Sequence, residues 1–169
     1  MDSDRRLQAG DLLVALKLAV SEPSAASVRA LGEALDLSKS TVANSLRRLR
    51  ALGLVREDGR VNKLAHRDCL EHAVRWIAPA EIGDFELGLP TAHASPTMAA
   101  KLTGDLDPLV MPLPHGPERG RAVSPLHPSA PAAAARDAKL HRLLAVVDSF
   151  RVGGARERQV AAVELRGCL

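Results

Sequence analysis

Hydroxyl, amide and guanidinium side chains recur between residues 38 and 50, and these groups can form hydrogen bonds with nucleic acid. Asparagine and arginine pair with the edges of adenine and guanine through two hydrogen bonds, while serine and threonine bond to either bases or phosphates. At about 100° per residue, Val42, Leu46 and Leu49 share one helix face, which leaves the polar side chains on the opposite face and its flanks. The residues that we predict to contact bases are Ser40, Thr41, Asn44, Arg47 and Arg48.

Basic and hydroxyl residues nearby are placed to hold phosphates. Hydroxyl groups and free amides at a helix N-terminus suit phosphate oxygens, and two arginines flank a predicted turn at Asp58-Gly59. Residues 39–63 carry seven basic side chains against two acidic ones, although the net charge of the 169-residue chain is only +3. A local excess of this kind is expected where a surface meets a polyanion, and a solvated helix face is the alternative explanation. The residues that we predict to contact the nucleic-acid backbone are Ser38, Lys39, Arg50, Arg56 and Arg60.

Three short helices followed by a hairpin are predicted to carry these side chains. Ser27 and Ser38 stand at N-cap positions. Pro23 ends the first helix because proline cannot continue it, and Gly53 ends the third. Asp58-Gly59 is a strong signal for a two-residue hairpin turn. The apolar residues at helical spacing are Leu12, Leu13, Leu16 and Val20 in the first helix, Val28, Leu31 and Leu35 in the second, and Val42, Leu46 and Leu49 in the third.

Residues 31–49, which read LGEALDLSKSTVANSLRRL, and residues 52–55, which read LGLV, carry the most specific part of this pattern. The pattern resembles the winged helix-turn-helix domain of bacterial transcription regulators of the MarR, IclR and GntR type. Gly32 fills the small-residue position where two helices cross. Asp36 replaces the usual turn glycine and must tolerate a left-handed conformation. The resemblance covers about a third of the chain.

The resemblance implies a transcription regulator that binds double-stranded DNA in a sequence-specific way. The recognition helix would lie at about 39–52 and the wing at about 55–61. A homodimer with two-fold symmetry would read two half-sites about one helical turn, ~34 Å, apart. We expect a repressor that acts on its own promoter.

Beyond residue 80 the sequence changes character. Nine of the eleven prolines lie between Pro90 and Pro131, with no sustained helical period. Too many apolar residues lie among them for a disordered linker, so we predict an ordered, extended arm. Within it, residues 109–113 and 121–126 could pair as an irregular β-hairpin, with the prolines at edge positions.

Two further helical regions are predicted. A fourth helix over 63–78 has a broad apolar surface, and residues 132–169 form a helical hairpin interrupted at Gly153-Gly154. Either region could form the interface of a homodimer. The predicted fold class is mainly α with a small β-wing, divided into a winged helix-turn-helix domain with its following helix at 1–80, a Pro-rich extended arm at 81–131 and a C-terminal helical hairpin at 132–169 for dimerisation or partner binding.

Signals for catalysis and metal binding are weak. The chain has no glycine-rich phosphate-binding loop, and Asp105 and Asp107 lack the third carboxylate that a catalytic magnesium site needs. His66, Cys69 and His72 are spaced by three, which turns the outer two ~120° apart on a helix, so they converge poorly on one ion. We therefore predict no enzymatic activity, no metal and no cofactor.

The composition predicts a cytoplasmic protein without membrane segments. Aromatic residues make up only 2% of the chain, which excludes the aromatic grooves that bind single strands. No window approaches the ~20 apolar residues of a membrane span, and the acidic start at residues 1–4 is unlike a secretory signal. Two cysteines are too few for a disulfide framework and fit a reducing compartment.

Two alternatives to a simple repressor remain open from the sequence. The first is an antitoxin-like or defence-operon regulator, whose C-terminal half, residues 81–169, binds a partner protein. The second is a ligand-responsive repressor, in which the arm and the C-terminal helices enclose a small molecule. The second is disfavoured because aromatic residues are few and no polar cluster converges in the sequence.

Overall fold

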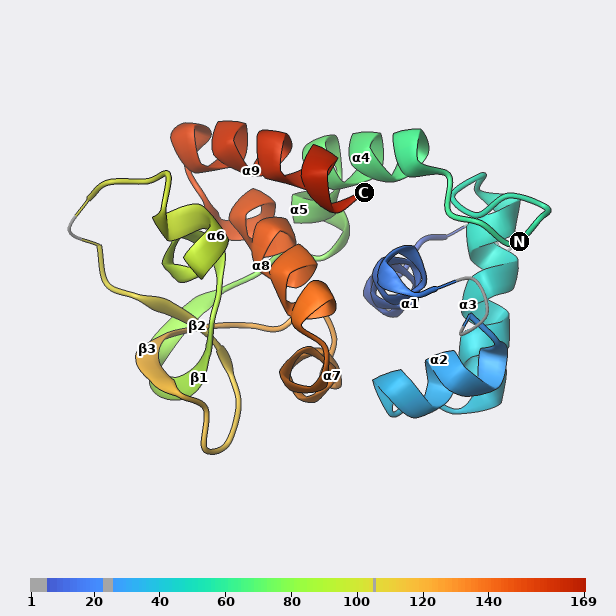
Figure 1. The fold of residues 1–169 in the computed structure, drawn as a ribbon, viewed down its shortest axis with the longest axis horizontal. Coiled ribbons are helices and arrows are strands. Elements are labelled where there is room, and N and C mark those ends of the chain that lie inside the picture. The colour runs from blue at the N-terminus through green and yellow to red at the C-terminus, as the bar shows by residue number, and fades with distance from the viewer. Residues whose placement is uncertain (1–5, 23–25, 105) are drawn as a thin grey trace.

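The structure is a computed structural model that describes residues 6–22, 26–104 and 106–169. Some residues named in the predictions lie outside the described ranges: the acidic start at residues 1–4, Pro23 and Asp105. Helices dominate the described part, and a small sheet lies at one end of the molecule (Figure 1). The predicted fold class, mainly α with a wing and a C-terminal helical hairpin, is confirmed.

The three helices predicted before the wing are confirmed. They are α1 (Ala9–Val20), α2 (Val28–Leu35) and α3 (Lys39–Ala51). Ser27 and Ser38 are the N-caps of α2 and α3, as predicted, and their hydroxyls accept hydrogen bonds from the amides of Ala30 and Thr41. Asp36, in the turn between α2 and α3, adopts the left-handed conformation with φ 54°.

The wing follows α3 and is a short loop closed by one antiparallel bridge between Val55 and Val61. The two-residue turn predicted at Asp58-Gly59 is wrong in detail. The amide of Gly59 donates to the carbonyl of Arg56 at 2.9 Å, and of the two predicted turn residues only Gly59 takes a positive φ, 81°. A turn followed by a left-handed glycine is a common longer hairpin loop, so the turn begins earlier than predicted, while the bridge between Val55 and Val61 agrees with a wing at about 55–61.

The single helix predicted over 63–78 is in fact two helices, α4 (Lys63–His72) and α5 (Val74–Ile77). The backbone at Ala73 leaves helical geometry, with φ −121° and ψ −24°. Trp76, in α5, is 76% exposed. The break redirects α5, so the packed face of α4 does not continue to Trp76.

The predicted arm contains a small closed sheet. Its strands are β1 (Ile82–Pro90), β2 (Leu109–Pro112) and β3 (Glu118–Val123), and each pairs with the other two. β1 is antiparallel to both of its neighbours. β2 and β3 therefore run parallel to each other, with Leu109 opposite Arg121. The hairpin predicted from these two segments is wrong. A hairpin requires antiparallel strands, whereas β2 and β3 are both antiparallel to β1 and so run parallel to each other.

Two glycines allow so small a sheet to close. A Cβ at Gly88 would lie 2.2 Å from the carbonyl oxygen of Met111, and a Cβ at Gly116 would lie 2.4 Å from the Cα of Gly88. The chain between β2 and β3 therefore passes directly against β1. A short 3-10 helix (Ala92–Ala94) and α6 (Pro96–Ala99) follow β1.

The C-terminal part is helical, as predicted. It consists of α7 (Ala130–Arg136), α8 (Ala138–Val152) and α9 (Ala155–Cys168). α8 and α9 form the predicted hairpin around Gly153-Gly154. Helix α9 runs unbroken over its 14 residues. Leu165 on this helix is buried, while Val163 is exposed.

Helix α8 lies at the centre of the molecule. Its side chains from residue 143 to residue 151 are all buried, and it packs against α1, α5, α7 and α9. Figure 1 shows the layers in order from α3 through α1 and α8 to the sheet, with α4 and α9 side by side along one edge. One apolar core thus runs through all three of the predicted segments.

A buried ion pair attaches the sheet to α8. Arg151 donates to Asp148 at 2.6 Å and to the carbonyl of Ala78 at 2.8 Å, and the hydroxyl of Thr91 donates to the other carboxylate oxygen of Asp148 at 2.6 Å. Burial raises the pKa of Asp148, and the contacts with Arg151 and Thr91 oppose that rise. Because Ala78 precedes β1 and Thr91 follows it, the pair fixes both ends of this strand.

Because the core is continuous, we expect a substitution in α8 to destabilise the winged part as well. Leu144→Ala should lower the free energy of unfolding by about 2–5 kcal/mol, since it leaves a cavity at a fully buried site. Urea denaturation followed by circular dichroism should still show one transition. The exposed Leu106→Ala is the control and should change stability by less than about 0.5 kcal/mol. Two separate transitions would contradict a shared core.

Candidate nucleic-acid interface

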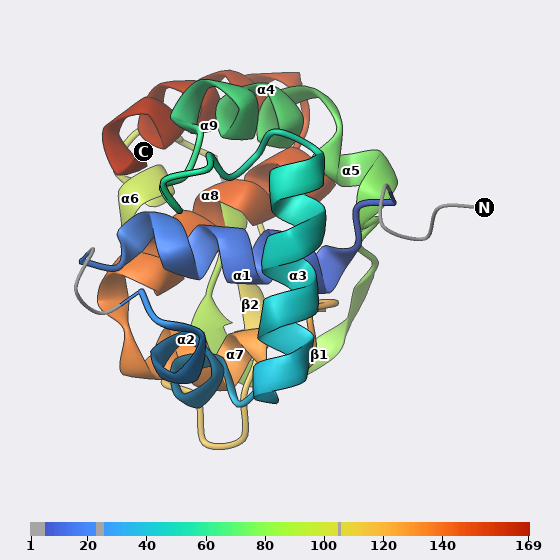
Figure 2. The same cartoon turned by 90° about the vertical axis from the view of Figure 1, so that its right-hand side faces the viewer.

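Helix α3 lies on the surface of the molecule, and Figure 2 looks directly onto it. Its inner face is apolar and buried through Val42, Leu46 and Leu49, as predicted. The hydroxyl, amide and guanidinium groups of the outer face are open to solvent. The predicted base-contact residues that are exposed on α3 are Ser40, Thr41, Asn44 and Arg47.

Arg48 lies against the core instead. Its guanidinium donates two hydrogen bonds to the carboxylate of Asp11 in α1, one from Nε to Oδ2 at 2.9 Å and one from Nη2 to Oδ1 at 2.6 Å. The side chain of Asp11 is 0% exposed and that of Arg48 only 15%. Turning Arg48 toward a base would leave a buried carboxylate without its cation, which is strongly unfavourable. This corrects the prediction that Arg48 contacts a base: it holds α3 against α1.

The sequence contained a signal for this pairing. At 100° per residue, Arg48 lies roughly 120° from the centre of the buried face of α3, on its flank rather than opposite. Asp11 directly precedes the apolar run that begins at Leu12, and a fully buried aspartate almost always has a partner. An acid at the edge of one buried stripe and a base on the flank of another are therefore candidates for a pair.

Ser38 has a structural role at the start of α3. Its Oγ accepts the amide of Thr41 at 3.1 Å and lies 2.8 Å from the hydroxyl of Thr41 and 2.9 Å from that of Ser40. The three hydroxyls thus form one exposed cluster at the N-terminus of the helix. A phosphate contact by Ser38 would have to coexist with its capping bond, and this contact stays a prediction.

The cations predicted to contact the backbone are all exposed. Lys39 and Arg50 lie near the two ends of α3, while Arg56 and Arg60 lie in the wing. A depression of about 690 Å³ between the wing and the end of α1 is lined by Arg56, Arg60 and Lys63. Lys63, the first residue of α4, was absent from the predicted set, although its position directly after the wing could have suggested it.

The comparisons with known proteins agree with this geometry. Residues 6–63 match the model of the MarR family. This part of the chain is a MarR-type winged-helix domain. The MarR family consists of DNA-binding transcription regulators rather than enzymes. The MarR match ends at the start of α4, and searches of curated proteins and of solved structures found no match to the chain.

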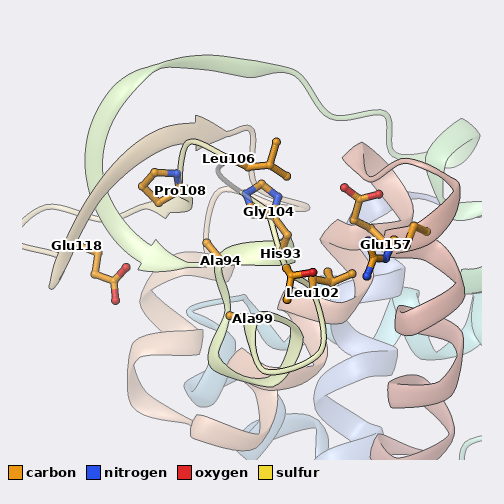
Figure 3. A pocket seen from close by; sticks show the side chains of 11 residues that line it. His93, Ala94, Ala99, Leu102, Gly104, Leu106, Pro108, Glu118 and Glu157 are labelled. Carbon is orange, nitrogen blue, oxygen red and sulfur yellow. The ribbon is translucent and has the colours of Figure 1, made fainter.

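An open groove of about 470 Å³ lies at the other end of the molecule from the MarR-type domain, between the arm and the start of α9 (Figure 3). Leu102 and Leu106 contribute apolar walls, and Arg156 and Glu157 contribute charges from the first turn of α9. Most of its lining residues are exposed. Small-molecule sites bury most of the surface of their ligand, so this groove gives little support to the ligand-responsive alternative.

The part of the chain that the structure describes holds no group of three or more histidine, cysteine, aspartate or glutamate side chains that could bind a metal ion. Cys69 and Cys168 are free, half-buried thiols, and burial raises the pKa of both. No helix within the described ranges is long and apolar enough to cross a membrane.

His66 is buried in α4, next to the wing. Neither ring nitrogen has a hydrogen-bond partner among the described residues. Burial lowers the pKa of His66, and backbone carbonyls of Asn62 and Leu54 partly oppose that effect. The junction between the wing and α4 is therefore packed around a neutral imidazole at pH 7.

Removing one partner of the pair between α1 and α3 should destabilise the protein. Arg48→Ala should lower the free energy of unfolding by about 3 kcal/mol, because it leaves the carboxylate of Asp11 buried and unpaired. The loss in the double variant Asp11→Ala/Arg48→Ala should be smaller than the sum of the two single losses. Urea denaturation measures all three, with the exposed Arg50→Ala as control. A loss for Arg48→Ala no larger than that for Arg50→Ala would rule out this role.

Stability should also fall as the pH is lowered from about 7 to about 5. The pKa of His66 is lower in the folded chain than in the unfolded chain, so below ~6.5 the unfolded chain binds a proton that the folded chain does not. His66→Leu removes the titratable imidazole and places an apolar side chain at this buried site, so it should flatten the pH dependence of the free energy of unfolding. The exposed His72→Gln is the control. An unchanged pH dependence in His66→Leu would show that this histidine is not responsible.

Proposed function

We propose that this protein is a sequence-specific transcription regulator that binds double-stranded DNA as a homodimer and represses its own promoter. The observation that carries the proposal is the exposed polar face of α3, directly opposite a buried apolar face, in a MarR-type domain. A helix held in this way can enter the major groove with its polar side chains leading.

Base reading is assigned to the middle and the N-terminal part of α3. Asn44 and Arg47 are exposed there and suit adenine and guanine through two hydrogen bonds each. Ser40 and Thr41, one turn earlier, suit either a base edge or a phosphate. The structural role of Arg48 removes it from this set.

Phosphate contacts are assigned to the cations that surround the reading face. Lys39 and Arg50 would hold the two ends of α3, and Arg56, Arg60 and Lys63 would hold the wing side. Contacts of this kind fix the register of the protein on DNA without reading sequence. They also make binding weaken steeply with salt, since each neutralised phosphate releases counterions.

The homodimer interface is assigned to the helices along one edge of the molecule. α8 is used within one chain, because its side chains are buried by α1, α5, α7 and α9. Large apolar side chains remain exposed on the edge helices, at Leu64 in α4, Trp76 in α5 and Val163 in α9. A dimer on the promoter would exclude polymerase, which is the basis for proposing a repressor.

A second candidate function is a regulator that also binds a partner protein at its far end. The first six residues of β1 are exposed, and they include Ile82 and Phe85. This strand lies at the opposite end of the molecule from α3 (Figure 1). A partner seated there would leave the DNA-reading face accessible, as an antitoxin-like regulator requires.

Fluorescence anisotropy on two labelled duplexes tests the proposal. One duplex is the DNA directly upstream of the protein's own gene, and the other is a scrambled sequence of the same composition. We expect tight, strongly salt-dependent binding to the first and weak binding to the second. Equal, weak binding to both would reject sequence-specific regulation.

Two variants separate base reading from phosphate contact. Asn44→Ala should cost on the order of 1–3 kcal/mol on the upstream duplex and little on the scrambled one. Arg56→Ala should weaken binding to both duplexes alike and reduce the salt slope by about one. Arg119→Ala, an exposed arginine in β3, is the matched control and should bind as wild type does. An equal loss on both duplexes for Asn44→Ala would reject its part in base reading.

A further inference from the structure

The turn that joins α2 to α3 is held in an unusual backbone conformation. Asp36 adopts φ 54° and ψ 42°, a left-handed region that side chains other than glycine disfavour. The next amide, that of Leu37, bonds back to the carbonyl of Gly32 at 2.9 Å. A Cβ at Gly32 would lie 2.7 Å from the carbonyl oxygen of Leu37. The turn is therefore tight, and its geometry determines how α3 leaves α2.

A residue from the C-terminal helices contacts this turn. Arg136, the last residue of α7, donates from Nη2 to the carboxylate of Asp36 at 2.7 Å and to the carbonyl of Ala34 at 3.1 Å. The last carbonyls of a helix have no partner within the helix, and a cation there is favourable. Arg136 thus donates a hydrogen bond to a terminal carbonyl of α2 and forms an ion pair with Asp36 at the same time. It comes from a part of the chain 100 residues further on.

The next residue holds the end of another helix of the MarR-type domain. Asp137 caps α8 by accepting the amides of Lys139 and Leu140, at 2.9 and 3.1 Å, and it also accepts the ammonium of Lys17 at 2.6 Å. Lys17 lies in the last turn of α1. Partial burial raises the pKa of Asp137, but the hydrogen bonds from Lys17 and the α8 amides outweigh it and lower that pKa.

We propose that the corner between α7 and α8 positions the recognition helix, with Arg136 as the positioning residue. Arg136 and Asp137 hold the ends of α2 and α1 from outside the MarR match, so the C-terminal half sets the geometry with which α3 meets DNA. The inference rests on the proposed function for its effect on DNA, while its effect on the turn itself does not.

The first test compares two arginine variants of the full chain. Arg136→Ala should weaken binding to the upstream duplex by about two- to five-fold, the range expected for an exposed ion pair. Arg142→Ala is the matched control, because it removes an arginine of similar exposure, paired with Glu164, from the same helical region. It should bind as wild type does. Equal binding by all three proteins, or an equal loss in both variants, would overturn the proposal.

The second test reports on the turn without DNA. Amide hydrogen exchange at Leu37 should be about two- to five-fold faster in Arg136→Ala than in wild type or Arg142→Ala. Exchange at buried α8 amides, such as that of Leu144, should be unchanged in both variants. Unchanged exchange at Leu37 would overturn the proposal. If wild type fails to distinguish the two duplexes, the proposed function fails, and the exchange result still decides the positioning role.

A third variant separates positioning from a direct contact of Arg136 with DNA. Asp36→Gly places at the turn a residue that adopts the left-handed conformation without strain. If Arg136 acts through the turn, adding Arg136→Ala to Asp36→Gly should change affinity by less than about 1.5-fold. A further two- to five-fold loss in the double variant would mean that Arg136 does not act through Asp36, and would overturn its positioning role at this turn.

Discussion

The burial of α1 between α3 and α8 is the constraint on which the rest of the structure depends. Its side chains from residue 11 to residue 16 are all 0% exposed, so this stretch of helix has no solvent-facing side. A helix that is buried all round belongs to the middle of a core rather than to its edge. Helix α3 and the C-terminal helices therefore pack on opposite sides of one element, and the polar face of α3 is supported by the whole chain.

This constraint explains where the charged side chains of the interior lie. An acid carried on a helix that is buried all round must find a cation, because an unpaired charge in the core is strongly unfavourable. Asp11 in α1 pairs with Arg48 in α3. Asp148 in α8 pairs with Arg151 and accepts a hydrogen bond from the hydroxyl of Thr91. The first pair joins two helices and the second joins a helix to the sheet. The interior charges thus hold neighbouring layers in register.

Patterns that act over a few residues were predicted correctly. The caps at Ser27 and Ser38, the left-handed Asp36 and the apolar spacing of α1 to α3 all depend on neighbours within one or two helical turns. The arm was harder to predict, because the parallel pairing of β2 and β3 depends on β1, and no strand was predicted over the residues of β1. No proline or glycine lies near the break at Ala73, and alanine itself favours helices, so no local signal predicts the break.

The sequence by itself determined a helix-turn-helix with a wing, a basic region and a polar face on its third helix, because periodicity, caps and local charge depend on residues that are close together in the chain. Only the tertiary structure decided which polar side chains of that helix face outward. Arg48 and Asp11 are 37 residues apart, and Lys17 and Asp137 are 120 apart. Pairs at such separations form only when packing brings their helices together, so no local pattern specifies them.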